Sequence, residues 1–349
     1  MGRQRGSVII IVLWIAVLLT VLVTAMAGKV RLSARAAYHN QEAVAQWAAV
    51  MEAVNRAEME LMLESMPRPV GEVQEESDEG EIQIPAYRFN GQPLELYYPA
   101  SEDVVVRIYD HIGKINLNRI PRNYMQSLIE KRLGGIDADP EQVQDLLAAW
   151  TDWTDLNDLE SLNGAEREYY LSLDPPYIPR NNPELDTVEE ILHIRGFAEL
   201  FEGVNLDAAF TVYGNNRAVN LNLATREAMQ LLPGLDDELI ETILAVREIR
   251  QINTRAQLAE IIPYENLVEL SNWVGNLTST YYTVFAYPKV VTEGVDPVTQ
   301  AYMEIIEVRS YNNLPRVYKV DPYGRLPDTA PPRIEEYGIK LPSALIGDL

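Results

Sequence analysis

Apolar residues are concentrated near the N-terminus of the chain, in one unbroken run. Residues 7–27 include no charged side chain and are dominated by Val, Ile, Leu and Ala. A helical run of about 20 apolar residues spans the hydrocarbon core of a bilayer, which is roughly 30 Å thick. This segment therefore predicts a single membrane-spanning helix.

The helical pattern continues beyond the apolar run. Residues 28–64 contain one Gly, no Pro and many Ala, Glu, Gln and Leu residues, all of which are compatible with a helix. Over residues 43–64 the apolar positions gather on one face and the polar positions on the other. Because Pro67 cannot continue a helix, we expect one helix over residues 7–66.

Two segments far apart in the sequence have the composition of β-strands. Residues 81–117 and 280–320 are rich in Val, Ile and Tyr and alternate apolar with polar positions, and Asn90-Gly91 is a turn signal in the first of them. Residues 118–279 between them have the pattern of helices and loops with no clear strand. The predicted fold class is α+β, with the long N-terminal helix packed on a small antiparallel sheet that a large all-α insertion interrupts.

The charge balance narrows what the chain can bind. The formal net charge is −23 at pH 7 and the sequence pI is about 4.5. So acidic a body repels phosphate backbones, which argues against nucleic acid as a ligand. The chain has no Cys, which excludes disulfides, thiolate catalysis and zinc–thiolate sites.

The sequence contains no recognisable catalytic constellation. The three histidines, His39, His111 and His193, fall on the long helix, in a predicted strand and in a later turn. The chain has no Gly-x-Ser-x-Gly elbow and no phosphate-binding loop. We therefore predict that the protein is not an enzyme and has no small-molecule substrate. A membrane-anchored hydrolase is the weakest alternative, because no reactive site supports it.

Two turns resemble helix-hairpin-helix units. Residues 232–237, Leu-Pro-Gly-Leu-Asp-Asp, lead into a predicted helix, and residues 192–197, Leu-His-Ile-Arg-Gly-Phe, resemble a degenerate second unit. DNA-binding hairpins hold phosphate with backbone amides and nearby Lys or Arg. Here Asp236, Asp237 and Glu238 would oppose a phosphate, which favours a packing module. A membrane-tethered helix-hairpin-helix DNA receptor is the alternative function.

The densest polar feature is the acidic stretch over residues 152–166, which has no Lys or Arg. If the preceding helix persists, Asp152 and Asp155 fall three residues apart on one face. Asp158 lies in the loop, and Glu166 returns after an Asn-Gly turn. Four carboxylates brought together repel one another without a cation, and hard oxygen ligands favour calcium over zinc or copper. The alternative is an acidic loop that is only solvated.

The first residues resemble a prepilin leader. Arg5-Gly6 followed by the apolar run from Ser7 is similar to the site that prepilin peptidase cleaves, directly after the glycine. Most pilins and pseudopilins carry Glu at mature position five, which is Ile11 here. This departure matches the protein K family, minor pseudopilins of the bacterial type II secretion system. The acidic stretch before Tyr169-Tyr170 is similar to that family as well.

The resemblance implies a location and a set of partners. Prepilin peptidase cleaves after Gly6, and Ser7 becomes the methylated N-terminus. The helix then crosses the inner membrane once, with the C-terminal body in the periplasm. The expected partners are other minor pseudopilins, resembling proteins I and J, in a hetero-complex. The expected role is at the tip of the pseudopilus, where the protein supports initiation of the pseudopilus and protein export across the outer membrane.

Two of the implied features concern individual residues. In a filament, the usual Glu neutralises the N-terminal amine of the subunit already in place, whereas a tip subunit meets no earlier amine. An unpaired carboxylate among packed apolar helices is costly, so Ile11 marks the tip position. Calcium is structural in this family, which implies that Asp152, Asp155, Asp158 and Glu166 hold calcium without a catalytic role.

These expectations divide the chain into six parts. They are a prepilin leader (1–6), a transmembrane and stalk helix (7–66), a first set of pseudopilin strands (67–117), an inserted α-helical domain with helix-hairpin-helix-like units (118–279), a second set of pseudopilin strands (280–325) and a C-terminal tail (326–349).

Overall fold

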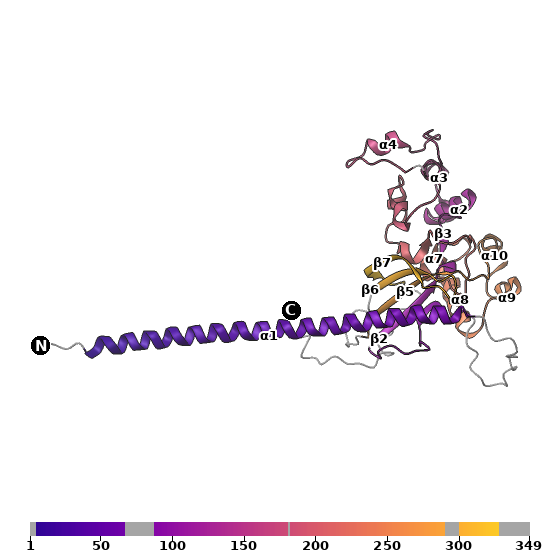
Figure 1. Ribbon diagram of the computed structural model, residues 1–349. Coiled ribbons are helices and arrows are strands. Elements are labelled where there is room, and N and C mark those ends of the chain that lie inside the picture. Colours follow the sequence, from indigo (N-terminus) through magenta and orange to yellow (C-terminus); the bar gives the residue numbers. More distant parts are fainter. Residues whose placement is uncertain (1–4, 67–86, 181, 290–299, 328–349) are drawn as a thin grey trace, which may run out of the picture. The chain divides into compact units, whose positions relative to one another are not determined.

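The computed structural model describes residues 5–66, 87–180, 182–289 and 300–327. It divides into two compact units, Met1–Glu52 and Ala53–Leu349, and the boundary falls inside helix α1 (Arg5–Glu64), the indigo helix of Figure 1. The first four residues of the predicted leader, the strand predicted over 81–86 and nearly all of the predicted tail lie outside the described residues.

In the first unit, α1 is a candidate membrane anchor by its length and composition. Within the described residues, it is the one helix long and apolar enough to cross a membrane, from Ile9 onward. The hydroxyls of Thr20 and Thr24 donate to carbonyls one turn earlier, each at 2.8 Å. These polar groups are therefore satisfied within the helix, as a lipid environment requires.

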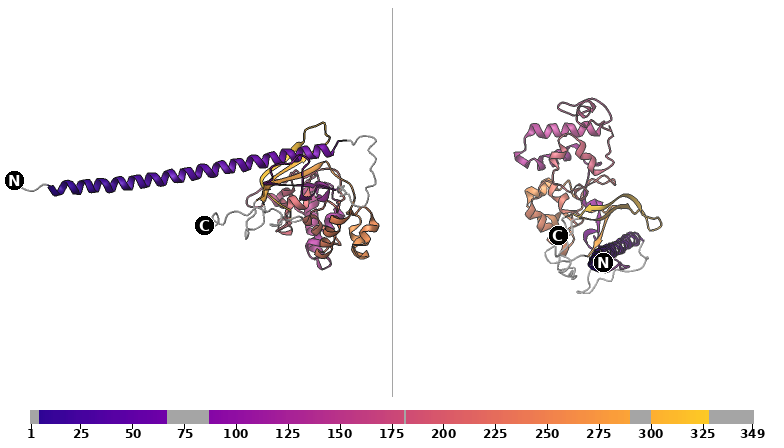
Figure 2. Two further views of the ribbon diagram at one scale, coloured as in Figure 1. Left: turned by 90° about the horizontal axis from the view of Figure 1, so that it is seen from below. Right: turned by 90° about the vertical axis from the view of Figure 1, so that its left-hand side faces the viewer.

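In the second unit, the last turns of α1 bury one face. Ala53, Val54, Ala57 and Leu61 are buried, a spacing that places them along one side of a helix. The sheet lies between these last turns and the helices of the insertion (Figures 1 and 2). Glu60 is also buried, where it accepts hydrogen bonds from the Arg88 guanidinium at 2.6 Å and the Tyr97 N–H at 2.7 Å.

The sheet combines strands from both strand-rich segments. Its five strands are antiparallel neighbours in the order β1-β2-β5-β6-β7. The central pairing, β2 with β5, joins Val104 to Pro288 and Asp110 to Tyr282, so the chain returns to the same sheet after the insertion. The strands are β1 (Asn90–Pro93), β2 (Val104–Asp110), β5 (Tyr281–Pro288), β6 (Gln300–Glu307) and β7 (Arg316–Arg325).

Two local predictions in the first segment are wrong. Asn90-Gly91 does not form a turn but lies in β1, where Gly91 has φ +88°. A Cβ on Gly91 would lie 2.1 Å from the Tyr109 ring, so the glycine serves close packing within the sheet. His111 is not in a strand but in the 3-10 helix η1 (His111–Gly113), because the Asp110 carboxylate caps the Ile112 N–H at 2.9 Å and ends β2.

The insertion is mainly helical but not all-α, which corrects the predicted fold class. Strand β4 (Phe210–Thr211) pairs in parallel with β3 (Ile115–Asn116). Two residues are too short for a period-two pattern, so this pairing left no sequence signal. The helices are α2 (Arg122–Arg132), α3 (Pro140–Thr154), α4 (Arg167–Leu171), α5 (Phe197–Leu200), α6 (Leu206–Ala209), α7 (Arg226–Leu231), α8 (Asp237–Ile249), α9 (Arg255–Ala259) and α10 (Tyr264–Leu270), with 3-10 helices η2 (Gly135–Asp137) and η3 (Val188–His193).

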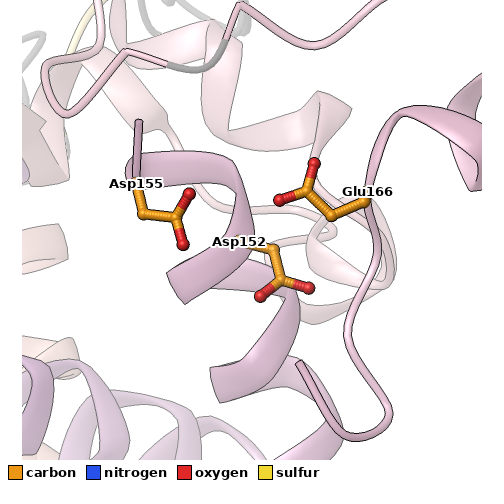
Figure 3. Close-up of side chains that lie close together, drawn as sticks. All are labelled: Asp152, Asp155 and Glu166. Carbon is orange, nitrogen blue, oxygen red and sulfur yellow. The ribbon is translucent and has the colours of Figure 1, made fainter. Parts of the chain in front are cut away.

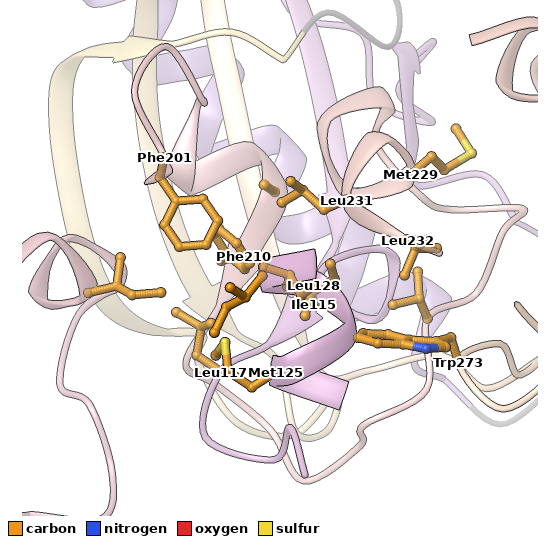
Figure 4. Close-up of a cluster of buried hydrophobic side chains, with 14 of the residues drawn as sticks. Ile115, Leu117, Met125, Leu128, Phe201, Phe210, Met229, Leu231, Leu232 and Trp273 are labelled. Atoms are coloured by element: carbon orange, nitrogen blue, oxygen red, sulfur yellow. The ribbon is translucent and has the colours of Figure 1, made fainter. Parts of the chain in front are cut away.

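The insertion has its own hydrophobic core (Figure 4). Side chains from β3, α2, α7 and the segment before β5 meet there, among them Ile115, Leu128, Leu231 and Trp273. Burying each such side chain contributes about 1.5–3 kcal/mol relative to leaving it exposed. This core contains residues from both ends of the insertion. Side chains more than a hundred positions apart in the sequence therefore pack together in it.

Candidate metal site in the acidic loop

Helix α3 places the first two carboxylates of the site. Asp139 caps its N-terminus by accepting a hydrogen bond from the Glu141 N–H at 3.0 Å, and Pro140 occupies the first helical position. The helix continues to Thr154, so Asp152 is in its last turn and Asp155 is its C-cap residue. The two carboxylates therefore lie on one face, as their three-residue spacing predicts.

Asp152 holds the acidic loop closed. Its side chain is 1% exposed, and its carboxylate accepts hydrogen bonds from the Ser161 N–H at 3.1 Å and the Ala165 N–H at 2.9 Å. Gly164 approaches so closely that a Cβ there would lie 1.8 Å from Asp152 Oδ2. The loop thus folds back over Asp152, and only glycine fits at the point of contact.

Glu166 is brought opposite α3 by this closure. Figure 3 shows Asp152 and Asp155 on α3 and Glu166 on the segment that leads into α4. One carboxylate oxygen of each residue lies within 4.8 Å of those of the other two. Glu166 is 5% exposed, and neither of its buried carboxylate oxygens accepts a hydrogen bond. Buried carboxylates in proteins are normally hydrogen-bonded, so this one lacks its usual compensation.

The electrostatics of Glu166 follow from this position. Burial, together with the negative charges of Asp152 and Asp155, raises the pKa of Glu166 to about 7, and the N–H of Arg167 offsets this rise only in part. A buried carboxylate facing two others requires either a proton or a cation to be stable. The three residues supply oxygen ligands only, which is the chemistry of calcium or magnesium and not of zinc or copper.

Asp158 does not join this group. The structure brings together Asp152, Asp155 and Glu166 and places Asp158 on the exposed part of the loop. The loop there is shaped by polar side chains, since Asp155 Oδ1 accepts from the Asn157 N–H at 2.9 Å and Asn157 Oδ1 from the Leu159 N–H at 2.8 Å. The Asp158 charge acts on the site from a distance, because it contributes to the raised pKa of Glu166.

Aromatic rings pack together on the elements that carry the site. Trp153 contacts the Tyr170 ring edge-to-face with 5.1 Å between ring centroids, and Tyr170 lies 5.2 Å from Tyr177. These rings join α3, α4 and the segment that follows α4 into one buried cluster. Sequence reasoning singled out the tyrosine pair but missed the Ser161 and Ala165 amides, because backbone donors have no residue signature.

The residues predicted for processing and for the tip lie on α1. Gly6 and Ser7 are in its first turns, and Ile11 follows with 56% of its surface exposed. Ile11 therefore presents an apolar side chain to the surroundings of the helix, where a carboxylate would stand among other apolar residues.

The first hairpin-like turn, residues 232–237, packs against α10 of the same insertion. Gly234, with φ +74°, joins α7 to α8, and a Cβ on it would lie 2.4 Å from the Asn266 carbonyl of α10. The Asn266 amide donates to the Gly234 carbonyl at 2.9 Å. Asp236 accepts the Leu239 N–H at 2.8 Å, so a carboxylate occupies the α8 N-terminus where a phosphate would bind. These contacts favour packing over DNA recognition.

The family comparison concerns the segment that contains the acidic loop. The family model described as type II secretion system (T2SS), protein K, matches residues 113–201. This match confirms the resemblance that the sequence predicted, over the part of the chain that includes all four predicted calcium ligands. A search of curated protein sequences finds no match for the chain.

A solved structure is similar to the chain at low identity. It is the GspK-GspI-GspJ complex from the enterotoxigenic Escherichia coli type 2 secretion system. The matched chain has 12% sequence identity and a TM-score of 0.49, and the alignment covers 82% of this chain and 98% of that one. A TM-score below 0.5 at this identity does not establish a shared fold.

Proposed function

With the protein K pattern of type II secretion present over residues 113–201, we propose that the chain is a minor pseudopilin at the tip of the pseudopilus, without enzymatic activity. The family match is the observation that carries this proposal. The candidate membrane helix supports it, because a pseudopilin is anchored by its N-terminal helix before assembly. In this role the protein supports initiation of the pseudopilus and export across the outer membrane.

The tip position is supported by the residue at mature position five. Ile11 lacks the carboxylate that would neutralise the N-terminal amine of a preceding subunit. A subunit that starts the filament has no such amine beneath it, and an unpaired carboxylate there would cost several kcal/mol. In this arrangement prepilin peptidase cleaves after Gly6, Ser7 is methylated, α1 crosses the inner membrane and the body lies in the periplasm.

The acidic loop holds a structural calcium ion in this proposal. Asp152, Asp155 and Glu166 supply the carboxylates, and the charge of Asp158, on the exposed part of the loop, acts on the same site. Two observations support this assignment: the unpartnered oxygens of Glu166, and one oxygen from each of the three carboxylates within 4.8 Å of the others. Calcium would cancel the repulsion within the group and fix the loop between α3 and α4, with no catalytic step.

Calorimetry of the full-length protein in detergent tests the calcium assignment. After removal of metal by a chelator, added calcium should raise Tm, because a ligand at 100 times its Kd stabilises the folded state by about 2.7 kcal/mol. Asp155→Ala combined with Glu166→Ala should abolish the shift. Glu160→Gln, an exposed acid of the same loop, is the matched control and should keep it. If the unaltered protein neither binds calcium nor shifts in Tm, the loop is only a solvated surface.

The partners expected for this function are minor pseudopilins resembling proteins I and J. The solved complex is named for three such chains, which supports a search for a corresponding hetero-complex here. Full-length protein should therefore co-purify with them from detergent extracts. Retention on duplex DNA at physiological salt would favour the DNA-receptor alternative instead.

A further inference from the structure

We propose that Arg195 is a positioning residue for the metal site, because its guanidinium holds the turn that carries Glu166 toward Asp152 and Asp155. This inference rests on the proposed calcium site and adds a residue that the sequence pattern did not assign to it. Arg195 belongs to the second hairpin-like turn, residues 192–197, which has no role in the proposed function.

The contacts of Arg195 converge on one side of the acidic loop. Its Nη1 donates to the Gly164 carbonyl at 2.7 Å, and its Nη2 donates to the Asn163 carbonyl and, at 3.4 Å, to the Asp145 carbonyl of α3. The guanidinium also lies over the Tyr169 ring of α4, 5.4 Å from its centroid. One side chain thus ties together α3, α4 and the turn between the carboxylates.

The turn that carries Arg195 is itself fixed against α3. Gly196 has φ +79°, and a Cβ there would lie 2.6 Å from Leu146 Cδ2, so this glycine allows the turn to reach the helix. The Arg195 N–H donates to the Tyr170 hydroxyl at 3.3 Å. The guanidinium therefore extends from a rigid base, which is what a residue that orients another group requires.

Residues 163–165 of the acidic loop are hydrogen-bonded by two side chains, Asp152 and Arg195. Asp152 accepts the Ala165 N–H at 2.9 Å, while Arg195 takes the carbonyls of the two preceding residues, Asn163 and Gly164. Because these two carbonyls already accept hydrogen bonds from Arg195, the ligand that we expect this segment to offer is the Glu166 side chain. Loss of the guanidinium would free the turn to rotate and would withdraw Glu166 from its place.

Outer residues that orient metal ligands typically change metal affinity by 10–100-fold when they are removed. We therefore expect Arg195→Met to weaken calcium binding by about 10–100-fold in full-length protein in detergent, measured by calorimetric titration after chelation. Arg195→Lys keeps one donor and should show a smaller loss. Arg119→Met, which removes an arginine paired with Glu184 outside the loop, is the matched control and should leave the calcium Kd unchanged.

Terbium luminescence supplies a measurement that a purely structural role would not change. Terbium replaces calcium, and its excited-state lifetimes in H2O and D2O report how many water molecules it binds. Arg195→Met should add water to the bound ion, because Glu166 no longer reaches it. If Arg195→Met fails to fold, Arg195→Lys carries the same comparison.

The outcomes separate this inference from the calcium assignment. If the unaltered protein binds no calcium, both are wrong. If it binds calcium and the Arg195 variants bind with the same Kd and the same hydration, the calcium site stands and the role of Arg195 is overturned. A lower Tm in chelator with unchanged calcium affinity would likewise make Arg195 a packing residue only.

Discussion

At the scale of single residues, the geometry of the carboxylate group depends on the backbone groups that contact Asp152 more than on the number of acidic residues nearby. The stretch carries other carboxylates, such as Glu160, that remain exposed and take no part in the group. Asp152 differs because backbone amides satisfy it and a glycine packs on it. Position within the fold, and not acidity alone, therefore decides which carboxylates come together.

Gly164→Ala tests this dependence. A Cβ at 1.8 Å from Asp152 Oδ2 forces the loop away from α3. We expect a loss of about 1–3 kcal/mol in unfolding free energy, of the size found for overpacked sites, and weaker calcium binding. Denaturant unfolding and calcium titration measure the two effects. Gly28→Ala, at a helical position with no heavy atom within 4 Å of the added Cβ, is the control and should be neutral or slightly stabilising.

At the scale of elements, the end of α1 meets the sheet through two carboxyl groups. Glu58 of α1 faces Glu304 of β6, which is 5% exposed and accepts from the Tyr302 hydroxyl at 3.1 Å. Burial, together with the hydrogen bond to Glu304 and the negative charge of Glu304, raises the pKa of Glu58 to about 7. Near neutral pH Glu58 therefore remains partly protonated at the contact between helix and sheet.

This pair predicts a pH dependence of stability. Because the pKa of Glu58 is higher in the folded chain than its ordinary value of 4.5, its contribution to stability is fully present below about pH 4.5 and is lost as pH rises through about 7. After discounting for solvent, the change is on the order of 1–2 kcal/mol. Chemical unfolding between pH 5 and 8 should show it, and Glu58→Gln should flatten the slope over this interval. An unchanged slope in that variant would contradict the assignment.

The apolar part of α1 predicts the effect of a charge at position 11. Ile11→Glu should lower assembly, since the carboxylate would lie unpaired among apolar helices at a cost of several kcal/mol. Ile11→Leu is the volume-matched control and should behave as the unaltered chain. The measurement is the number and position of labelled subunits in isolated pseudopili. Incorporation of the Glu variant along whole filaments would count against a tip position.

At the scale of the whole molecule, membrane insertion and processing should be separable from folding of the body. The candidate cleavage site is at the start of α1, whereas the sheet and the insertion belong to the other compact unit. Gly6→Arg should leave the precursor uncleaved in the membrane with its body folded. Mass spectrometry of the mature N-terminus decides the matter, since a start at Met1 or beyond Ala27 in the unaltered protein would refute cleavage after Gly6.

Assembly with partner pseudopilins should depend on the exposed apolar face of α1. Val44 is 68% exposed on this helix, and exposed apolar stripes normally mark a contact surface. Val44→Lys should reduce co-purification with the minor pseudopilins resembling proteins I and J. Asn55→Lys, at an exposed polar position of the same helix, should not. Equal recovery of both variants would place the contact elsewhere.

The sequence by itself determined the features that depend on neighbours a few positions apart. The long helix follows from its apolar and helix-forming residues and from the proline after Met66, and the strands follow from alternation. The placement of Asp152 and Asp155 on one face follows from helical geometry. The leader and acidic stretch also carried the family resemblance, and the match over residues 113–201 confirms it for the segment that contains the acidic stretch.

Only the tertiary structure decided how distant groups meet. In the folded chain Asp158 lies outside the carboxylate group, and the carboxylate of Glu166 is buried without a hydrogen-bond partner. Arg195 reaches the Gly164 carbonyl from a distant part of the sequence. The tertiary structure also placed Gly91 in a strand and paired β4 with β3. The physical reason is that burial and backbone contacts between segments depend on packing of the whole core. The pattern of residues within one stretch of sequence therefore cannot predict them.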